Sequence, residues 1–352
     1  MTTEQKPLGS GFGPQTTAEE VLVGHDLRGN VALVTGGHSG IGLETTRVLS
    51  KAGAILIVGA RDVEKARTNV GTMKNVEVIQ LDLASPNSID RFADAFLNTE
   101  RPLHILIHNA GLSGPPLTRD ARGYEIQFAT NHLAHFQLTA RLWRALKNSG
   151  NARVVDSSIG HNVAGMDFED PNFKRRPYDK WVAYGQSKTA TSLFAVEFDK
   201  RAQAYGVRSF AVHPGAVLTN LLRYMSDEEL KVWGVYRENG VPKASGGFKS
   251  LEQGAATAIW CAVSPQLNDK GGVYCEDCDI ARVVPADDKG FSGVRPYAID
   301  KEGGRNPLGV KRGADPRAIQ LVRPSAESIL LSFWKPLLRR DETNPGWPHD
   351  SS

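Results

Sequence analysis

The chain has 352 residues, of which 40% are hydrophobic and 23% charged, and its formal net charge is +3 at pH 7. This composition is that of a folded globular protein and excludes a disordered or collagen-like chain. The basic residues are interspersed, and the longest runs, such as Lys174-Arg175-Arg176, are too short to predict a nucleic-acid surface. No stretch approaches the ~18 apolar residues of a membrane-spanning helix.

The N-terminus and the cysteines indicate the compartment. Residues 1–13 lack the hydrophobic segment of a secretory signal. Three cysteines, Cys261, Cys275 and Cys278, cannot all pair and do not form a disulfide framework. The C-x-x-C spacing of Cys275 and Cys278 has no second pair of ligands to complete a zinc site, so packing at a strand end is favoured over a metal. We expect a cytoplasmic protein without a metal.

In chain order, residues 1–25 predict an extended arm, and short apolar runs then alternate with helix-like runs from Asn30 onward. The predicted strands are Val31–Thr35, Ile55–Ala60, Val76–Leu81, Leu103–Ile107, Arg153–Val155 and Val207–Val212. The predicted helices are Ile41–Lys51, Val63–Val70, Pro86–Leu97, Tyr124–Leu146, Val182–Ala204 and Leu251–Ala262. Continuous apolar strands alternating with helices predict an α/β fold with a doubly wound parallel sheet.

The first predicted strand leads directly into a glycine-rich loop and then a helix. The loop reads Thr35-Gly36-Gly37-His38-Ser39-Gly40-Ile41-Gly42. Glycines let the backbone approach a pyrophosphate closely, and the helix N-terminus offers unpaired N–H groups. A tight glycine-rich turn without a ligand is the alternative. The position between a first strand and a helix favours a dinucleotide site.

The spacing of Gly36, Gly40 and Gly42 resembles the short-chain dehydrogenase/reductase family, in its retinol-dehydrogenase-like and WW-domain-oxidoreductase-like branch. Further motifs of that family follow in order, from Asp82 and Asn109 to a Tyr-x-x-x-Lys sequence. The resemblance covers about residues 26–281. It implies a single domain with a seven-stranded Rossmann sheet, preceded by the arm 1–25 and followed by an extension, 282–352.

The resemblance also implies a nicotinamide cofactor and the residues that bind it. They are Gly36, His38, Ser39, Gly40, Ile41, Gly42, Arg61, Asp82, Leu83, Asn109, Ala110, Gly111, Tyr184, Lys188, Pro214, Gly215, Val217 and Thr219.

The end of the second strand favours NADP over NAD. An acid there would bind the ribose 2′-OH, whereas the planar, permanently charged guanidinium of Arg61 suits a 2′-phosphate. His38 offers a second donor. Asp62 argues for NAD, but one residue further along it is placed to cap the next helix. The alternative for Arg61 is a solvated surface arginine.

Tyr184 and Lys188 are four residues apart, so on a helix they share one face. A phenol titrates near ~10, and a neighbouring ammonium favours the phenolate. Tyr184 is therefore the predicted general acid/base. The resemblance implies that Lys188 also holds the nicotinamide ribose, that Ser158 polarises the substrate oxygen, and that Asn131 supports a proton relay. A surface Tyr–Lys pair and a helix-interior Asn are the structural alternatives.

One departure from the family pattern precedes the serines. The family reads R-I-V-x-V-S-S, whereas this chain reads Arg153-Val154-Val155-Asp156-Ser157-Ser158, one apolar residue shorter. The deletion predicts a shifted strand register or a shortened loop. We therefore expect an NADP(H)-dependent oxidoreductase acting on the alcohol or carbonyl group of a hydrophobic small molecule, with a catalytically weak cofactor-binding sensor or scaffold as the alternative. A second copy of the chain, in a homodimer or homotetramer, is the expected protein partner.

Overall fold

The computed structural model describes residues 3–232, 234–239, 241–244 and 246–300. Its centre is an eight-stranded sheet in the order β3-β2-β1-β4-β5-β6-β9-β10, in which β10 alone is antiparallel to its neighbour. The strands are β1 (Val31–Thr35), β2 (Ile55–Ala60), β3 (Val76–Gln80), β4 (Ile105–His108), β5 (Arg153–Ser157), β6 (Arg208–His213), β9 (Val273–Glu276) and β10 (Asp279–Ile280). The doubly wound parallel sheet is confirmed. The predicted number of seven strands is wrong, because the two-residue β10 is too short to leave a periodic signal.

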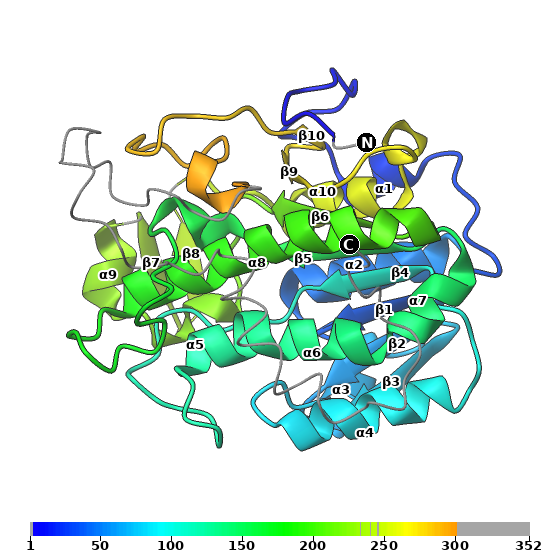
Figure 1. Cartoon of the computed structure of the whole chain (residues 1–352), viewed down its shortest axis with the longest axis horizontal. Coiled ribbons are helices and arrows are strands. Elements are labelled where there is room, and N and C mark those ends of the chain that lie inside the picture. Colours follow the sequence, from blue (N-terminus) through cyan, green and yellow to red (C-terminus); the bar gives the residue numbers. More distant parts are fainter. Residues whose placement is uncertain (1–2, 233, 240, 245, 301–352) are drawn as a thin grey trace, which may run out of the picture.

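Helices cover both faces of the sheet (Figure 1). On one face lie α1 (Ala18–Leu22), α2 (Gly40–Lys51) and α10 (Leu251–Val263), and on the other α4 (Pro86–Leu97), α6 (Ala134–Arg141), α7 (Trp143–Ser149) and α8 (Lys180–Ala202). The helix α3 (Val63–Val70) joins β2 to β3. Alternate residues of each strand feed the two cores: Ala32 and Val34 pack with α2 and α10, whereas Val31 and Leu33 pack with α4 and α6. Within the described residues, no helix has the length and apolar character needed to cross a membrane.

The predicted single helix Tyr124–Leu146 is wrong. It is divided into α5 (Ile126–Phe128), a π-helical turn η1 (Ala129–Leu133), α6 and α7. The break before α7 falls at Leu142, whose backbone leaves the helical region at φ −86° and ψ 3°. The wide π turn carries Asn131, which binds two neighbouring segments as described below. Such turns are frequent at functional sites.

The N-terminal arm and the segment around residues 294–298 pack on the sheet edge formed by β9 and β10. The Gln5 side chain donates to the carbonyls of Tyr274 and Ala281, each at 2.7 Å, and the Asp279 carboxylate accepts three backbone N–H groups of the arm. Further along the chain, Val294 and Ala298 are fully buried against this edge. The edge strand is thus covered by the protein's own chain.

Candidate active site

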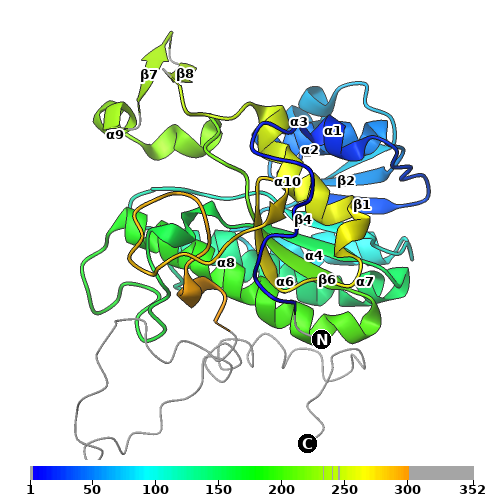
Figure 2. The ribbon, with the colours of Figure 1, turned by 90° about the horizontal axis from the view of Figure 1, so that it is seen from above.

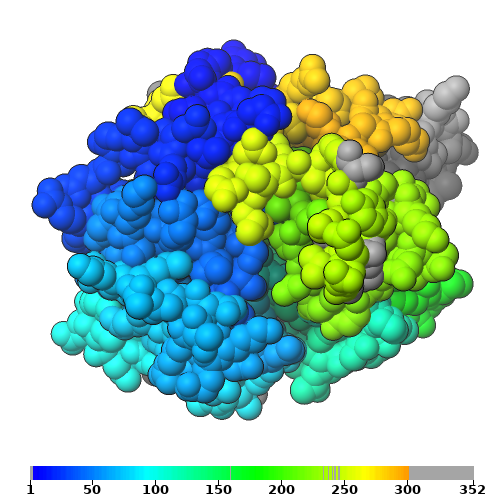
Figure 3. All heavy atoms as spheres, turned by 180° about the vertical axis from the view of Figure 1, so that it is seen from behind, coloured from blue at the N-terminus to red at the C-terminus, as the bar shows by residue number. Residues whose placement is uncertain are grey.

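A cavity of about 1080 Å³ opens at the carboxyl ends of the parallel strands, where ligands bind in open α/β sheets. Figure 3 shows the molecule hollowed between its blue N-terminal half and the yellow-green segment near residue 230. Most of the predicted site residues line it: Gly36, His38, Ser39, Gly40, Ile41, Arg61, Asp82, Leu83, Asn109, Ala110, Gly111, Tyr184, Lys188, Pro214, Gly215, Val217 and Thr219. Gly42, Asn131 and Ser158 are not among the lining residues.

The glycine loop forms the floor of one half of the cavity. Gly36 and Gly40 have φ of +65° and +53°, a conformation that favours glycine. Gly42 lies behind the loop at the start of α2, where an added Cβ would stand 2.4 Å from Asn109 Nδ2 and 2.5 Å from Gly36 O. The first turn of α2 therefore approaches β4 closely only because residue 42 is glycine. Its N-terminus leaves N–H groups for an anionic ligand.

A buried threonine ties this loop to the end of β4. Thr35 Oγ1 accepts the backbone N–H groups of Asn109 and Ala110, both at 3.1 Å. It also lies 3.0 Å from His135 Nε2, while His135 Nδ1 lies 3.0 Å from the carbonyl of Asn131 and must donate to it. His135 is therefore neutral and accepts the Thr35 proton at Nε2, in keeping with burial, which holds its pKa well below the usual value.

One corner of the cavity is lined by basic and polar side chains. His38, Arg61 and Lys65 line it together with Asn69, whose amide donates to the His38 carbonyl at 3.0 Å. His38 Nδ1 is buried and has no partner among the described residues, and burial followed by the charge of Lys65 lowers the pKa of His38. Asp62 does not line this corner. Its carboxylate accepts the Lys65 backbone N–H at 3.0 Å and caps α3.

Tyr184 and Lys188 lie one turn apart on α8, and both line the cavity while being only 8% and 5% exposed. Lys188 Nζ donates to the Ser157 carbonyl at 2.8 Å and lies 5.8 Å from the centre of the Tyr184 ring. Gly160 makes room for the ring, since a Cβ there would approach it to 2.4 Å. Burial raises the pKa of Tyr184 and lowers that of Lys188 to about 8. Burial thus shifts each of the two groups toward its neutral form.

Ser158, the serine that we predicted to polarise the substrate oxygen, does not line the cavity. Ser158 is fully buried, and its hydroxyl donates to the Lys188 carbonyl at 2.6 Å and lies 2.7 Å from Ser192 Oγ. Ser157 is the serine that lines the cavity. It ends β5 opposite Val212, and because side chains alternate along a strand, adjacent serines face opposite sides. With one apolar residue fewer before the pair, the first serine takes the cavity side.

Asn131 lies behind the cavity wall. Its side chain accepts the Leu112 N–H at 2.8 Å, donates to the Leu112 carbonyl at 2.9 Å and donates to Ser187 Oγ at 2.9 Å. It thus joins the segment after β4 to α8. Together with Thr35 and His135 it fixes the loop that carries Asn109 to Gly111.

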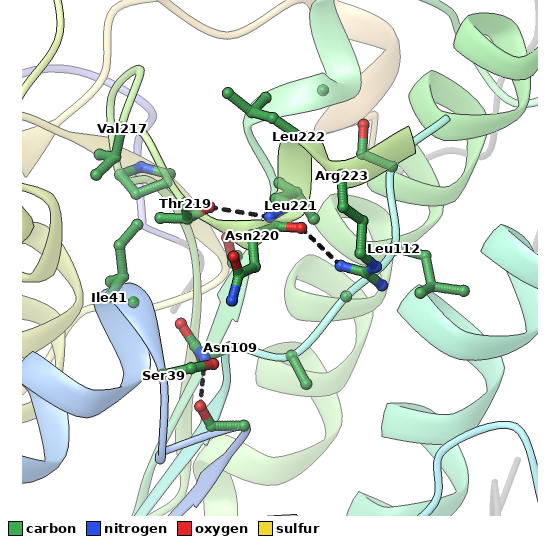
Figure 4. Close-up of a pocket in the computed structure, with 18 of the residues that line it drawn as sticks. Ser39, Ile41, Asn109, Leu112, Val217, Thr219, Asn220, Leu221, Leu222 and Arg223 are labelled. Carbon is green, nitrogen blue, oxygen red and sulfur yellow. Dashed lines mark hydrogen bonds between the residues drawn. The ribbon is translucent and has the colours of Figure 1, made fainter. Parts of the chain in front are cut away.

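The other half of the cavity consists of residues that the motifs do not identify. Leu112, Trp181, Leu222, Val232, Phe248 and Phe291 supply apolar walls. Figure 4 shows Leu221, Leu222 and Arg223 on the side opposite Ser39 and Asn109. Phe291 belongs to a loop gathered around Arg295, a fully buried side chain that donates to the Asp288 and Ser292 carbonyls at 2.8 and 3.2 Å. The one sequence signal was the glycine pair at 290 and 293, which marks a turn.

The comparisons with known proteins agree with this geometry. The family model described as short chain dehydrogenase matches residues 30–230. The chain is 43% identical over 284 residues to a "Probable oxidoreductase" from Streptomyces lividans, covering 79% of this chain and 94% of that protein. It is 40% identical to "Retinol dehydrogenase 12" from Mus musculus, covering 72% of this chain and 79% of that one. A solved Pseudomonas aeruginosa RhlG/NADP active-site complex shares the fold, with a TM-score of 0.56, 24% identity, and coverage of 71% and 95%.

The chain belongs to the short-chain dehydrogenase/reductase family of oxidoreductases, in its retinol-dehydrogenase-like branch.

Proposed function

We propose that the protein is an NADP(H)-dependent oxidoreductase that interconverts the alcohol and carbonyl groups of a hydrophobic small molecule. The observation that carries this proposal is the Tyr184–Lys188 pair, buried on α8 and lining the same cavity as the glycine loop. A buried phenol and a buried ammonium stabilise each other's charged forms, whereas burial by itself favours the neutral form of each. Stabilisation of the Tyr184 phenolate by the Lys188 ammonium would allow Tyr184 to exchange a proton with a substrate oxygen.

In this proposal Tyr184 gives a proton to the substrate oxygen or takes one from it. Lys188 favours the phenolate and holds the nicotinamide ribose. Ser157, rather than Ser158, polarises the substrate oxygen, since it is the serine that lines the cavity. Asn131 supports the proton relay indirectly, through its bonds to Leu112 and Ser187.

The residues present fit a nicotinamide dinucleotide. Glycines at positive φ border the N-terminus of α2, and the unpartnered Nδ1 of His38 lies beside Arg61 and Lys65. These donors favour NADP over NAD, because a 2′-phosphate meets two fixed cations there. When bound, the nicotinamide supplies or accepts the hydride.

The test is NADPH oxidation by the purified protein with a panel of hydrophobic ketones and aldehydes. We expect turnover that falls about 10³-fold in Tyr184→Phe while NADPH affinity changes little. Tyr224→Phe is the matched control, because Tyr224 is 42% exposed and does not line the cavity. Tight NADPH binding without turnover of any carbonyl or alcohol would instead favour a sensor or scaffold.

The proposal includes a cytoplasmic location and self-association as a homodimer or homotetramer. The three cysteines are free and buried, which suits a reducing compartment. Light scattering of the purified protein measures the number of subunits, and a monomer would contradict this part of the proposal.

A further inference from the structure

The segment between β6 and α10 forms a small cap on the apolar half of the cavity. The cap consists of the described residues within 218–248 and includes the turn η4 (Asn220–Tyr224) and the helix α9 (Asp227–Val232). Figure 2 shows α9 standing away from the main body. Leu222 and Val232 of the cap line the cavity. The position of the cap against the main body therefore sets the shape of this half of the cavity.

The cap has a small apolar core of its own. Its buried members are Leu222, Met225, Leu230 and Val235, and Leu218, Ala244 and Phe248 pack against them. Among the described members of this cluster, Trp181 is the one that comes from outside the cap. Trp181 lies in the first turn of α8 and also lines the cavity. At this ring the cap thus meets the helix that carries Tyr184 and Lys188.

An ion pair joins the cap to α8 beside the Trp181 ring. Lys180 Nζ lies 2.7 Å from Glu229 Oε1 and 2.8 Å from Glu229 Oε2. The pKa of Glu229 is lowered, first by the hydrogen bond from Lys180, and a hydrogen bond from the Trp181 side chain adds to the lowering. Glu229 therefore binds two neighbouring side chains of α8, one of which is part of the cavity wall.

On the α8 side this contact is held by the main body. Asp179 caps α8 and accepts the Trp181 N–H at 2.8 Å. The fully buried Gln127 donates to the Lys180 carbonyl at 2.9 Å and accepts the Gly114 N–H at 3.0 Å. The Trp181 ring lies against Gly114, where an added Cβ would stand 3.4 Å from it. Lys180 and Trp181 thus offer the cap a fixed point of attachment.

On the cap side the carboxylate of Glu229 is bound into α9. The Ser226 N–H donates to Glu229 Oε2 at 2.8 Å, and the Glu229 N–H donates to Ser226 Oγ at 3.2 Å. This reciprocal pair caps the N-terminus of α9. A movement of Glu229 would therefore move α9 and Val232 at its end, which lines the cavity.

We propose that Glu229 is a positioning residue that holds the cap against α8 through Lys180 and Trp181, and thereby sets how tightly the cavity holds an apolar substrate. The effect on substrate rests on the proposed function, whereas the attachment of the cap is a property of the chain itself. The Lys180 and Glu229 side chains are 29% and 28% exposed. Loss of such a pair should change the opening equilibrium of the cap by about threefold to fivefold.

The decisive experiment measures hydrogen–deuterium exchange of the α9 amides in the full-length protein without cofactor. Lys180→Met removes the ammonium from α8 and leaves the sequence of the cap unchanged. We expect the protected amides of α9 to exchange about threefold to fivefold faster, because the cap opens more often. Lys180→Arg keeps the charge and should retain the exchange of the wild type. Lys243→Met is the matched control, since Lys243 pairs with Glu238 inside the cap, and should leave α9 unchanged.

Two further measurements separate the ion pair from a general loss of packing. Glu229→Gln should accelerate exchange by the same factor, and its combination with Lys180→Met should add nothing, because both remove one interaction. In the wild type, about 0.5 M NaCl should also accelerate exchange by screening the pair, whereas Lys180→Met should not respond. Unchanged exchange in Lys180→Met, additive effects in the double variant, or equal salt responses would each overturn the proposal.

Enzyme activity tests the effect on substrate. Lys180→Met should raise KM for a hydrophobic ketone or aldehyde about threefold to fivefold, with NADPH affinity unchanged and kcat retained within about twofold. A fall in kcat at unchanged KM would contradict the role of Glu229 in holding the substrate. If no carbonyl compound is turned over, the exchange measurement still decides whether Glu229 holds the cap, so the two proposals fail independently.

Discussion

The two halves of the cavity are built in different ways. The half with the glycine loop is made of strand ends, and buried side chains such as Thr35 bind its loops to the sheet. The opposite half comes from segments outside the sheet: the turn η4 (Asn220–Tyr224), the end of the helix α9 (Asp227–Val232), residues 246–248 and the loop 288–293. The hairpin of β7 (Val235–Glu238) and β8 (Val241–Ala244) lies between α9 and residues 246–248 in the chain. Figure 2 shows α9 and the hairpin standing away from the main body.

This difference indicates which half of the cavity is already formed before a ligand binds. Strand ends are held by the register of the sheet, whereas Val232 and Phe291 on the other side are 84% and 66% exposed. Exposed apolar side chains around a cavity are those that a hydrophobic ligand would cover. We therefore expect substitutions in the first half to change cofactor affinity or folding, and substitutions in the second to change substrate preference.

In this comparison of the two halves, the largest effect on cofactor affinity is expected from Gly42→Ala. The added Cβ would stand 2.4 Å from Asn109 Nδ2, so α2 and the loop after β4 must move apart, and a displacement of ~1 Å costs on the order of 10²-fold. NADPH affinity, measured by fluorescence titration, should fall about 100-fold. Gly13→Ala is the control, because a Cβ at Gly13 meets nothing within 4 Å. An unchanged affinity would mean that this half is not rigid.

Thr35→Val should lower stability in the same half. The valine leaves the N–H groups of Asn109 and Ala110 buried without their acceptor, at a cost of about 1–3 kcal/mol each. The midpoint of urea denaturation should therefore drop clearly. Thr35→Ser keeps the hydroxyl and should stay close to the wild type. Equal midpoints for the valine and serine variants would show that the hydroxyl does not hold the loop.

Arg61→Ala should separate the two nicotinamide cofactors. Loss of one exposed guanidinium facing a 2′-phosphate should weaken NADPH binding about tenfold, or ~1.4 kcal/mol, and leave NADH binding unchanged. Arg67→Ala is the matched control, since Arg67 pairs with Glu64 on the same helix and does not line the cavity. Equal losses for NADPH and NADH would argue against NADP.

The same division explains how much the sequence could predict. Positions that follow a buried strand, such as Asp82 and Asn109, were predictable because register brings strand ends together. Ser158 was not, because one missing residue before it reverses which serine faces the cavity. Lys180 and Glu229 meet only through the packing of segments far apart in sequence. Phe291 depends on the packing of Arg295, which no local pattern encodes.

The smallest effect is expected from Phe291→Ala in the second half of the cavity. Its ring stands at the cavity wall but is 66% exposed, so it should contribute only part of the burial of an apolar substrate, roughly 1 kcal/mol. KM for bulky hydrophobic substrates should rise about threefold to tenfold, while kcat and NADPH affinity stay unchanged. Phe12→Ala, on the N-terminal arm and 39% exposed, is the matched control. A fall in kcat instead would mean that the loop 288–293 reaches the reacting atoms, and the separation between the two halves would not hold.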